Sequence, residues 1–256
     1  MKLNVKEEFI CNFNVIVDVY NGITIKSDEV KEDKNIFLEN IKELICETKD
    51  MYNLIWVYIN IEKAEFIKVL TNLDFKFHTC NENRILLVKQ QKHNAIIPTA
   101  SNHTLGVGVV VVNPKNQLLV IKEKISDIGF KLPGGHIDDG EMISSACVRE
   151  VFEETGIKIE FEGVISLGHF YPHQFDKSNL YILCKGSAIT SQINIIDTDE
   201  IVDAKWIDVN EYLNDEKVFP YIKEIVKTSL KNKGLVLRNE LLTINREFEL
   251  LFPNDL

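Results

Sequence analysis

The stretch that decides the fold of this chain is Gly135–Ile157, which reads GHIDDGEMISSACVREVFEETGI. Its fixed positions follow the pattern G-x5-E-x7-R-E-apolar-x-E-E-x-G-apolar. On a helix, at about 100° per residue, Glu150, Glu153 and Glu154 fall within one arc of roughly 100°. Val151 and its apolar neighbours occupy a different arc, so one face can pack against a sheet while the other presents three carboxylates. The segment predicts a helix with a functional acidic face.

The three carboxylates of this helix need a compensating positive charge. Like charges three or four residues apart destabilise a helix by roughly a few tenths of a kcal/mol per pair. A hard divalent cation, which prefers oxygen ligands, would offset this repulsion. Arg149 lies at the edge of the acidic arc and can hold one carboxylate in a bidentate pair. We therefore expect a metal site here, against the alternative of a solvated acidic face, which is usual for Glu-rich stretches taken alone.

A glycine-rich turn precedes the helix, where residues 130–135 read FKLPGG. Glycine permits positive φ and a close approach of the backbone to a ligand. A backbone carbonyl of this turn, such as that of Gly135, can therefore complete a metal shell. Gly156 matches the glycine that commonly follows the last residue of a helix. At the first turn, Met142 lacks a capping oxygen, and Asp139 is the expected substitute.

The pattern resembles the Nudix box at every defining position. The resemblance implies metal-dependent hydrolysis of a nucleoside diphosphate linked to another moiety, with Mg²⁺ or Mn²⁺ as the cofactor. It also implies an α/β fold, the α/β/α sandwich with a mixed sheet. The residues that it points to are Glu153, Glu154 and Arg149 for catalysis, Glu150, Glu153, Glu154 and Gly135 for the metal, and Gly134, Glu141 and Gly156 for structure.

Sequence outside the box extends this resemblance to a two-domain subfamily. The matching segments are Leu73–His78, Leu105–Val110 and His169–Tyr181. They look like the antisense fibroblast-growth-factor type and the plant ADP-ribose/NADH-type Nudix proteins, whose smaller front domain resembles half of an acetyltransferase fold. The front domain lacks a recognisable acetyl-CoA pyrophosphate loop in its sequence, which disfavours acetyl transfer.

The order of hydrophobic patterns predicts two domains and a tail. We place a smaller α+β front domain at residues 1–94, a linker at 95–104, the Nudix domain at 105–232 and a helical tail at 233–256. Periodicity and turn signals in the front domain predict strands at 9–19, 23–26, 54–61 and 84–89, and helices at 33–48 and 62–73. The Nudix domain should hold strands at 105–112, 117–123, 161–171, 179–186 and 203–207, and a helix at 221–231. The tail helix is expected at Asn239–Leu250.

Composition disfavours several partners. The 256 residues carry a formal net charge of −10 and no basic stripe, which argues against a nucleic-acid partner. The five cysteines are odd in number, widely spaced and without a C-x-x-C pair, as expected for reduced thiols in a cytoplasmic protein. The sequence shows no run of roughly 18 apolar residues and no signal-peptide pattern at its start, so we expect no membrane partner.

Two groups of residues beyond the box are candidates for the site. Glu200 is the expected downstream base or ligand, because members of this fold often supply another acid from the loop before the last sheet strand. A solvated acidic loop is the alternative. The aromatic residues Phe130, Tyr171, Phe175 and Tyr181 are expected to contact substrate, since aromatic rings stack on nucleobases. Ordinary hairpin packing explains aromatic residues in this region as well.

These observations favour a pyrophosphohydrolase that releases a nucleoside monophosphate and a phosphorylated remainder. ADP-ribose or a related nucleotide sugar is the favoured substrate, and NADH is the next candidate. Pro172 lies near the position where ADP-ribose-type members of the family tend to carry a proline, and the sequence motifs of other substrate groups are absent from this sequence. The alternative is a ligand-sensing regulator or protein-interaction module without turnover, which need not retain every acid of the box. An isomerase on the same fold is disfavoured by the hydrolase-type spacing.

The front domain shows no catalytic cluster in its sequence, and subunit contact is the expected role. We expect a homodimer, because two-fold association is the commonest state of soluble oligomers and Nudix hydrolases frequently pair. An exposed strand edge, such as that of Leu54–Ile61, could be covered in this way.

Overall fold

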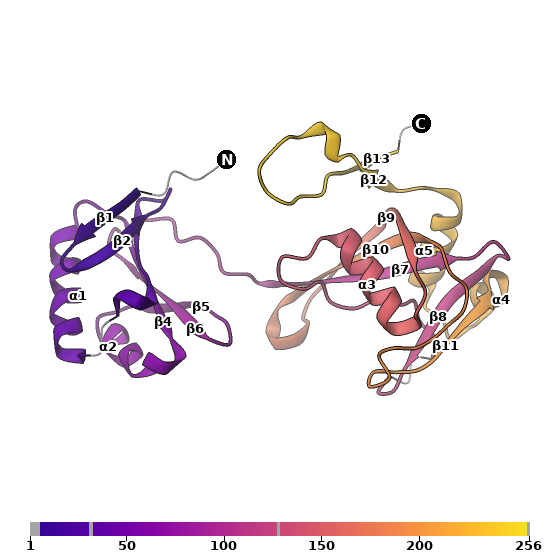
Figure 1. The fold of residues 1–256 in the computed structure, drawn as a ribbon, viewed down its shortest axis with the longest axis horizontal. Coiled ribbons are helices and arrows are strands. Elements are labelled where there is room, and N and C mark those ends of the chain that lie inside the picture. Colours follow the sequence, from indigo (N-terminus) through magenta and orange to yellow (C-terminus); the bar gives the residue numbers. More distant parts are fainter. Residues whose placement is uncertain (1–5, 31–32, 127–128, 255–256) are drawn as a thin grey trace. The chain divides into compact units, whose positions relative to one another are not determined.

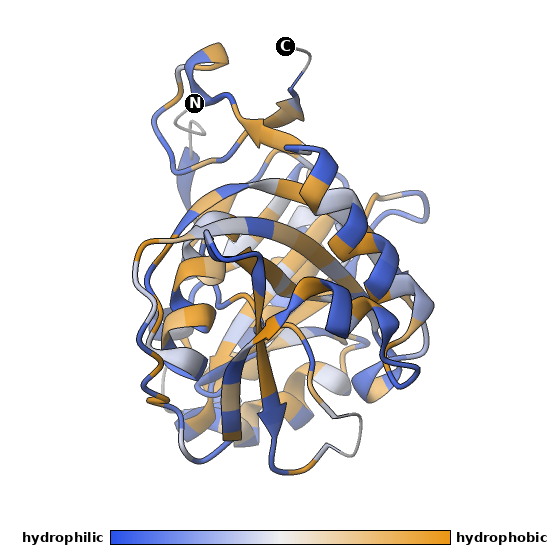
Figure 2. Ribbon diagram, turned by 90° about the vertical axis from the view of Figure 1, so that its right-hand side faces the viewer, coloured by the Kyte–Doolittle hydropathy of each residue, from blue (hydrophilic) through white to orange (hydrophobic). Residues whose placement is uncertain are grey.

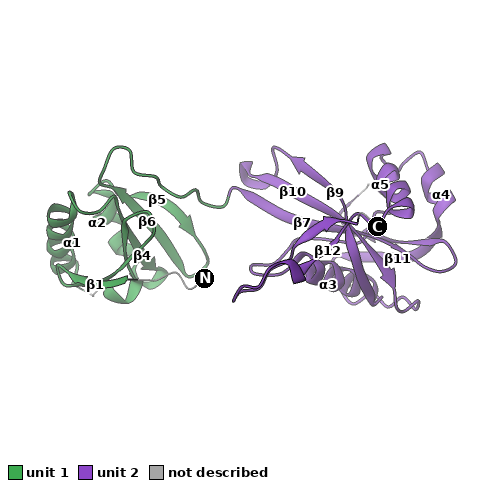
Figure 3. Cartoon of the chain, turned by 90° about the horizontal axis from the view of Figure 1, so that it is seen from above, with its two compact units in different colours: residues 1–101 green, residues 102–256 purple. Residues whose placement is uncertain are grey.

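The computed structural model describes residues 6–30, 33–126 and 129–254, and Figure 1 shows their fold. The chain divides into two compact units, Met1–Ser101 and Asn102–Leu256, which are coloured separately in Figure 3. Both units are built on a mixed sheet. The first is an α+β domain, and the second contains the acidic helix.

The first unit contains a six-stranded sheet in the order β1-β2-β3-β4-β6-β5. Neighbours are antiparallel except β3 and β4, which are parallel. Two α-helices and two 3₁₀ turns complete the unit. The strands are β1 (Lys6–Ile10), β2 (Phe13–Val17), β3 (Gly22–Ile25), β4 (Leu54–Asn60), β5 (Lys76–Cys80) and β6 (Arg84–Gln90), and the helical elements are η1 (Ser27–Glu29), α1 (Lys34–Thr48), η2 (Ile61–Phe66) and α2 (Ile67–Thr71).

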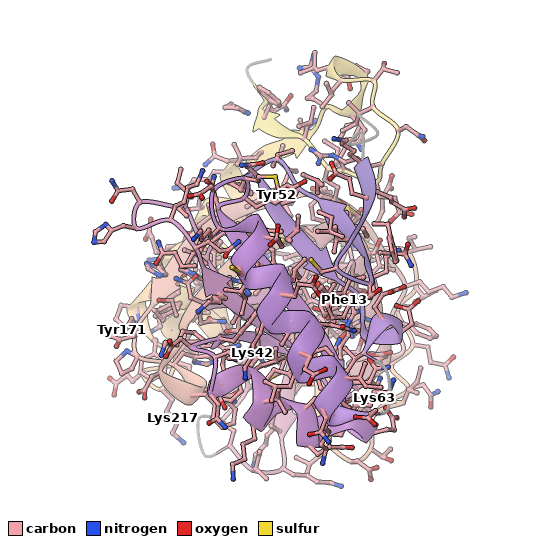
Figure 4. All side chains as sticks on the ribbon, turned by 90° about the vertical axis from the view of Figure 1, so that its left-hand side faces the viewer. Phe13, Lys42, Tyr52, Lys63, Tyr171 and Lys217 are labelled. Atoms are coloured by element: carbon pink, nitrogen blue, oxygen red, sulfur yellow. The ribbon has the colours of Figure 1, made fainter. Side chains whose placement is uncertain are left out.

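Helix α1 forms where the sequence predicts it. The Asp33 carboxylate accepts hydrogen bonds from the amides of Asn35 and Ile36, which caps the first turn. Phe37, Ile41 and Leu44, at helical spacing, pack into the core of the first unit. Lys42 lies on the exposed face (Figure 4), and Ile36 is also exposed. The amphipathic pattern therefore fixes which side of α1 faces the sheet.

Three expectations for the first unit were wrong. The predicted strand 9–19 is two strands, because Cys11 and Asn12 adopt positive φ and make a two-residue hairpin turn between Ile10 and Phe13. The predicted helix 62–73 is a 3₁₀ turn followed by the short α2, with a kink at Lys63. Strand β4 is not an edge, because it pairs with β3 on one side and β6 on the other.

The second unit contains a seven-stranded sheet in the order β11-β8-β7-β10-β9-β12-β13. Strands β7 and β10 are parallel, and the other pairs are antiparallel. The strands are β7 (His103–Val112), β8 (Gln117–Glu123), β9 (Ile159–Phe170), β10 (Ser178–Ala188), β11 (Ile201–Asp208), β12 (Leu235–Leu237) and β13 (Leu251–Pro253). The helical elements are α3 (Ile143–Thr155), η3 (Gln174–Asp176), α4 (Val209–Asn214), α5 (Pro220–Lys231) and η4 (Asn239–Leu241).

Helices cover both faces of this sheet. Helix α3 packs on one face through Ala146, Cys147 and Val151, in a core that includes Val107 and Val109 of β7. Helices α4 and α5 pack on the opposite face. Figure 2 shows the central strands as largely hydrophobic, as expected for strands buried on both faces. The predicted α/β/α sandwich with a mixed sheet is confirmed.

The predicted tail helix at Asn239–Leu250 was wrong. The tail instead pairs β12 with β13 and extends the main sheet through the pair Leu235 and Val164. The side chain of Asn239 donates to the carbonyl of Phe248 and accepts from the amide of Leu250, which closes a loop. Leu235 and Leu251 pack against the core on either side of this loop, whereas Leu241 and Leu242 of the predicted helix are exposed. The last two residues of the tail lie outside the described part.

No helix among the described residues is both long and apolar enough to cross a membrane.

Candidate active site

Helix α3 presents its acidic face because Ala146, Cys147 and Val151 are buried and its end is fixed, although Val148 and Phe152, expected to pack, are exposed. Gly156 adopts φ of 70° and donates its amide to the carbonyl of Phe152. A Cβ atom on Gly156 would lie 2.4 Å from the carbonyl oxygen of Asn194, so both conformation and space require glycine. Gly156 thereby ends the helix directly after the acidic residues.

The glycine turn lies against these acids. Gly134 adopts φ of 145°, and a Cβ atom there would lie 2.1 Å from the carbonyl oxygen of Val107. The carbonyl of Gly135 accepts a hydrogen bond of 2.8 Å from the amide of Val107. A Cβ atom on Gly135 would lie 2.7 Å from the Glu150 carboxylate. The missing side chains let the backbone of the turn approach the helix.

Glu154 is a buried carboxyl group, with only 5% of its surface exposed. Burial raises its pKa to about 8, although the amide of Gly134, which donates to Glu154 Oε2 at 2.7 Å, and the charge of Lys131 oppose this rise. Burial also raises the pKa of Glu150, against the opposing charge of Arg149. Two neighbouring acids with raised pKa values in one cluster of carboxylates are typical of a functional site.

Arg149 organises the remaining acids. Its Nε and Nη2 atoms donate to the two carboxylate oxygens of Glu141 at 2.9 and 2.8 Å, which makes a bidentate pair. Its Nη1 atom donates to Glu150 at 2.9 Å and to Glu153 at 3.1 Å. Glu141 also accepts a hydrogen bond from the amide of Asp138. One guanidinium group therefore fixes the orientation of three box carboxylates.

The donor atoms of this site suit a hard divalent cation. Glu150 and Glu154 offer carboxylate oxygens, and the Gly135 carbonyl lies in the turn beside them. Within the described part of the chain, no three Asp, Glu, His or Cys side chains converge into a preassembled metal cluster. The Gly134 amide binds only one oxygen of Glu154 and Arg149 only one oxygen of Glu150, so these contacts orient the two carboxylates.

Glu200 joins the site from a distant part of the sequence. It directly precedes β11, and its carbonyl accepts from the amide of Lys124 at 2.9 Å. Its negative charge contributes to the raised pKa of both Glu150 and Glu154. The fold therefore brings this predicted acid within electrostatic range of Glu150 and Glu154.

The four aromatic candidates lie in different settings. Tyr181 packs against the backbone of Gly106 and Gly108, and burial, followed by the charges of Glu154 and Glu150, raises its pKa. Phe130 is half-buried, with the ammonium group of Lys205 4.0 Å from its ring centroid.

Tyr171 and Phe175, in contrast, lie on the segment between β9 and β10 and are 70% and 92% exposed. Figure 4 labels Tyr171. Tyr181 is thus beside the acids with its ring in the core, whereas Tyr171 and Phe175 are open to solvent.

Sequence reasoning missed three residues that shape the site. Lys131, which precedes the Leu-Pro-Gly-Gly segment, lowers the pKa of Glu154 and pairs with Glu123. The carbonyl of His136 accepts from Arg149 at 2.9 Å. Glu249 accepts from the amide of Ser144 in the first turn of α3. The position of Lys131 beside the glycine turn could have identified it as a residue of the site from sequence. Nothing in the sequence around Glu249 indicates its contact with α3.

Comparison with known families agrees with the geometry. A model of the NUDIX domain matches residues 102–228, and a model of a Nudix hydrolase domain matches residues 13–90. The chain belongs to the Nudix hydrolase family, whose members are pyrophosphatases of nucleoside diphosphate-linked compounds.

Within this family, the chain is similar to plant and animal proteins. It is 28% identical over 228 residues to Nudix hydrolase 8 of Arabidopsis thaliana, covering 84% of this chain and 62% of that protein. It is 27% identical over 231 residues to nucleoside diphosphate-linked moiety X motif 6 of Homo sapiens, covering 86% and 72%. The Xenopus laevis protein of the same name is 32% identical over 154 residues, covering 58% and 70%.

Proposed function

We propose that this protein is a Mg²⁺- or Mn²⁺-dependent pyrophosphohydrolase that cleaves the diphosphate of a nucleoside diphosphate linked to another moiety. The observation that carries the proposal is the pairing of the partly buried Glu150 with the buried Glu154, both of which lie against the Gly134–Gly135 turn. Burial of two carboxyl groups side by side disfavours their joint ionisation. A divalent cation at this position would favour the ionised form of both.

The protein residues have separate proposed roles. When bound, a divalent cation would neutralise charge on the diphosphate and lower the pKa of water at the site. Glu150, Glu154 and the Gly135 carbonyl would hold it, and Glu153 would share a metal or orient water. Arg149 positions Glu150 and Glu153 through its hydrogen bonds to both. Glu200, whose charge acts on both Glu150 and Glu154, is our candidate to accept the proton of the attacking water.

ADP-ribose or a related nucleotide sugar is the proposed substrate, with NADH as the next candidate. The exposed rings of Tyr171 and Phe175 offer stacking surfaces for a base, and Lys205 beside Phe130 offers a positive charge for a phosphate. The plant and animal relatives support a substrate with a nucleoside diphosphate but do not select one.

The decisive experiment is a substrate panel with Mg²⁺, read as phosphate released after phosphatase coupling. ADP-ribose, nucleotide sugars, NADH and dinucleoside polyphosphates should be compared, with a Glu154→Gln variant as the matched control. Cleavage of ADP-ribose should release AMP and ribose 5-phosphate, with label from labelled water in one product only. Free adenine or ADP would contradict attack at the diphosphate. Tight metal-dependent binding without turnover would favour a sensor instead.

We also propose that the protein is a homodimer. Strand β4 is interior, so a contact through its edge is excluded, but β1 and β5 are the outer strands of the front sheet among the described residues. Phe9 on β1 and Phe77 on β5 are large exposed apolar residues. Pairing at an edge strand would cover such residues and the unpaired backbone groups beside them. Light scattering of the full chain tests this proposal, and a monomeric mass would contradict it.

A further inference from the structure

The first turn of α3 receives its cap from the far end of the chain. Met142, at the N-cap position, has no side-chain oxygen, although its backbone angles of φ −82° and ψ 152° are those of a capping residue. The carboxylate of Glu249 instead accepts from the amide of Ser144, with Oε1 at 3.1 Å and Oε2 at 3.4 Å. Ser144 is the second helical residue, whose amide a local cap would normally bind. Glu249, and not Asp139, takes this role.

The tail holds Glu249 in place from both sides along the chain. Asn239 donates to the carbonyl of Phe248 and accepts from the amide of Leu250, the two neighbours of Glu249. Leu251 packs against the core that contains Ala146 and Cys147 of α3. The peptide segment that carries Glu249 is therefore fixed relative to the helix.

The base of the tail is fitted to the sheet edge. Leu235 pairs with Val164 of β9. A Cβ atom on Gly163 would lie 2.5 Å from the carbonyl oxygen of Leu235, and a Cβ atom on Gly234, where φ is 70°, would lie 2.1 Å from that of Val164. Two glycines thus permit the close contact of tail and sheet.

The capped turn is directly linked to the acids of the site. Glu141 precedes Met142 and holds Arg149 in the bidentate pair. Arg149 in turn holds Glu150. A displacement of the first turn of α3 would therefore move Glu141 and change the orientation of the proposed metal ligand Glu150.

We propose that Glu249 is a positioning residue, which caps α3 from the C-terminal tail and thereby sets the affinity of the site for its divalent cation. The negative charge of Glu249 also lies at the positive end of the helix dipole, which adds to the effect of the hydrogen bond. The inference deepens the proposed function and rests on it for the identity of the metal site.

The test compares Glu249→Ala with Glu247→Ala, a control at an exposed position two residues away. Hydrogen exchange of the Ser144 amide should become about fivefold faster in Glu249→Ala, the size of effect expected for loss of one helix cap. Mn²⁺ affinity, measured by electron paramagnetic resonance of the free ion, should fall by a similar factor, and the Mg²⁺ concentration for half-maximal turnover should rise. Glu249→Gln, which keeps an acceptor oxygen, should retain most of the protection.

A second variant separates capping from a general role in holding the tail. Met142→Ser places a hydroxyl group at a position with capping backbone angles. In the double variant Met142→Ser/Glu249→Ala, we expect both Ser144 protection and Mn²⁺ affinity to recover. Failure of this rescue, or unchanged Ser144 exchange in Glu249→Ala, would overturn the proposal. Hydrogen exchange and Mn²⁺ binding are measured without turnover. A wild-type protein that cleaves no substrate would therefore contradict the proposed hydrolysis, while these two measurements would still test the role of Glu249.

Discussion

Arg149 and Glu141 form a bidentate pair, with donor–acceptor distances of 2.9 and 2.8 Å, across eight residues of sequence. Glu141 lies before α3 and Arg149 lies within it, so the pair joins the loop to the helix. The same guanidinium group also reaches Glu150 and Glu153. The arginine of the box is therefore a support for the acids, and its planar shape is what allows it to serve three of them.

Arg149→Lys should weaken this support. A lysine keeps the charge but cannot bind both oxygens of Glu141 while reaching Glu150. We expect a loss of about 1.5–3 kcal/mol in the free energy of unfolding, the usual worth of hydrogen bonds to charged groups. Urea unfolding measures it, with Arg238→Lys in the tail as the control. Equal stability of the two variants would show that the bidentate pair contributes little.

Glu154→Gln should remove most of the activity while the fold persists. The substitution preserves size but removes one negative charge from the proposed metal shell. We expect turnover to fall by about 10²-fold or more, since metal charge stabilisation contributes several kcal/mol. Glu150→Gln should behave similarly, whereas Glu47→Gln in the front unit should have no effect. Near-wild-type turnover with unchanged metal dependence in Glu154→Gln would contradict the site.

Gly135→Ala should impair metal use through a direct clash. The new Cβ atom would lie 2.7 Å from Glu150 Oε1, so the carboxylate must move. We expect a higher Mg²⁺ requirement in steady-state assays. Gly140→Ala is the contrasting variant, because φ there is 81° but a Cβ atom would meet nothing within 4 Å. The Gly140→Ala variant should lose stability through backbone strain and keep the wild-type Mg²⁺ requirement. An equal rise in the Mg²⁺ requirement of the two variants would contradict the proposed clash.

The stability of the metal-free protein should depend on pH through Glu154. Burial raises its pKa from the ordinary value of 4.5 to about 8, so the folded state binds a proton more tightly than the unfolded state does. Protonated Glu154 therefore makes its full contribution to stability below the ordinary pKa. This contribution is lost as the pH rises through the pKa of Glu154 in the folded state. In EDTA, the free energy of unfolding of the wild type should fall over this interval.

The matched variant for this prediction is Glu154→Gln, which is neutral throughout and should give a flatter pH profile. The difference between the two profiles isolates Glu154 from other titrating groups. Added Mg²⁺ should restore the wild type at the upper end of the interval, because a ligand that binds only the folded state stabilises it. A wild-type profile parallel to that of the variant would contradict the raised pKa.

The local sequence determined the acidic helix, the glycine turn and the family. These features are readable because they depend on spacing within about twenty residues: a helical period sets the acidic face, and Gly156 ends it. Strand positions in the second unit were also predicted closely, since β7 and β8 are short apolar runs bounded by turn residues. The family in turn implied the sandwich of helices around a mixed sheet.

Only the tertiary structure decided the contacts between distant segments. Ser144 and Glu249 are separated by 105 residues, and no local pattern marks their hydrogen bond. The tail forms strands where Leu235 and Leu251 pack against the core of the second unit and β12 pairs with β9 and β13. Glu200 lies near Glu154, and the pKa of Glu154 is raised, because sheet and helix close around that carboxyl group. Desolvation is a property of the packed fold, so the sequence alone could name the acids but could not give their electrostatic setting.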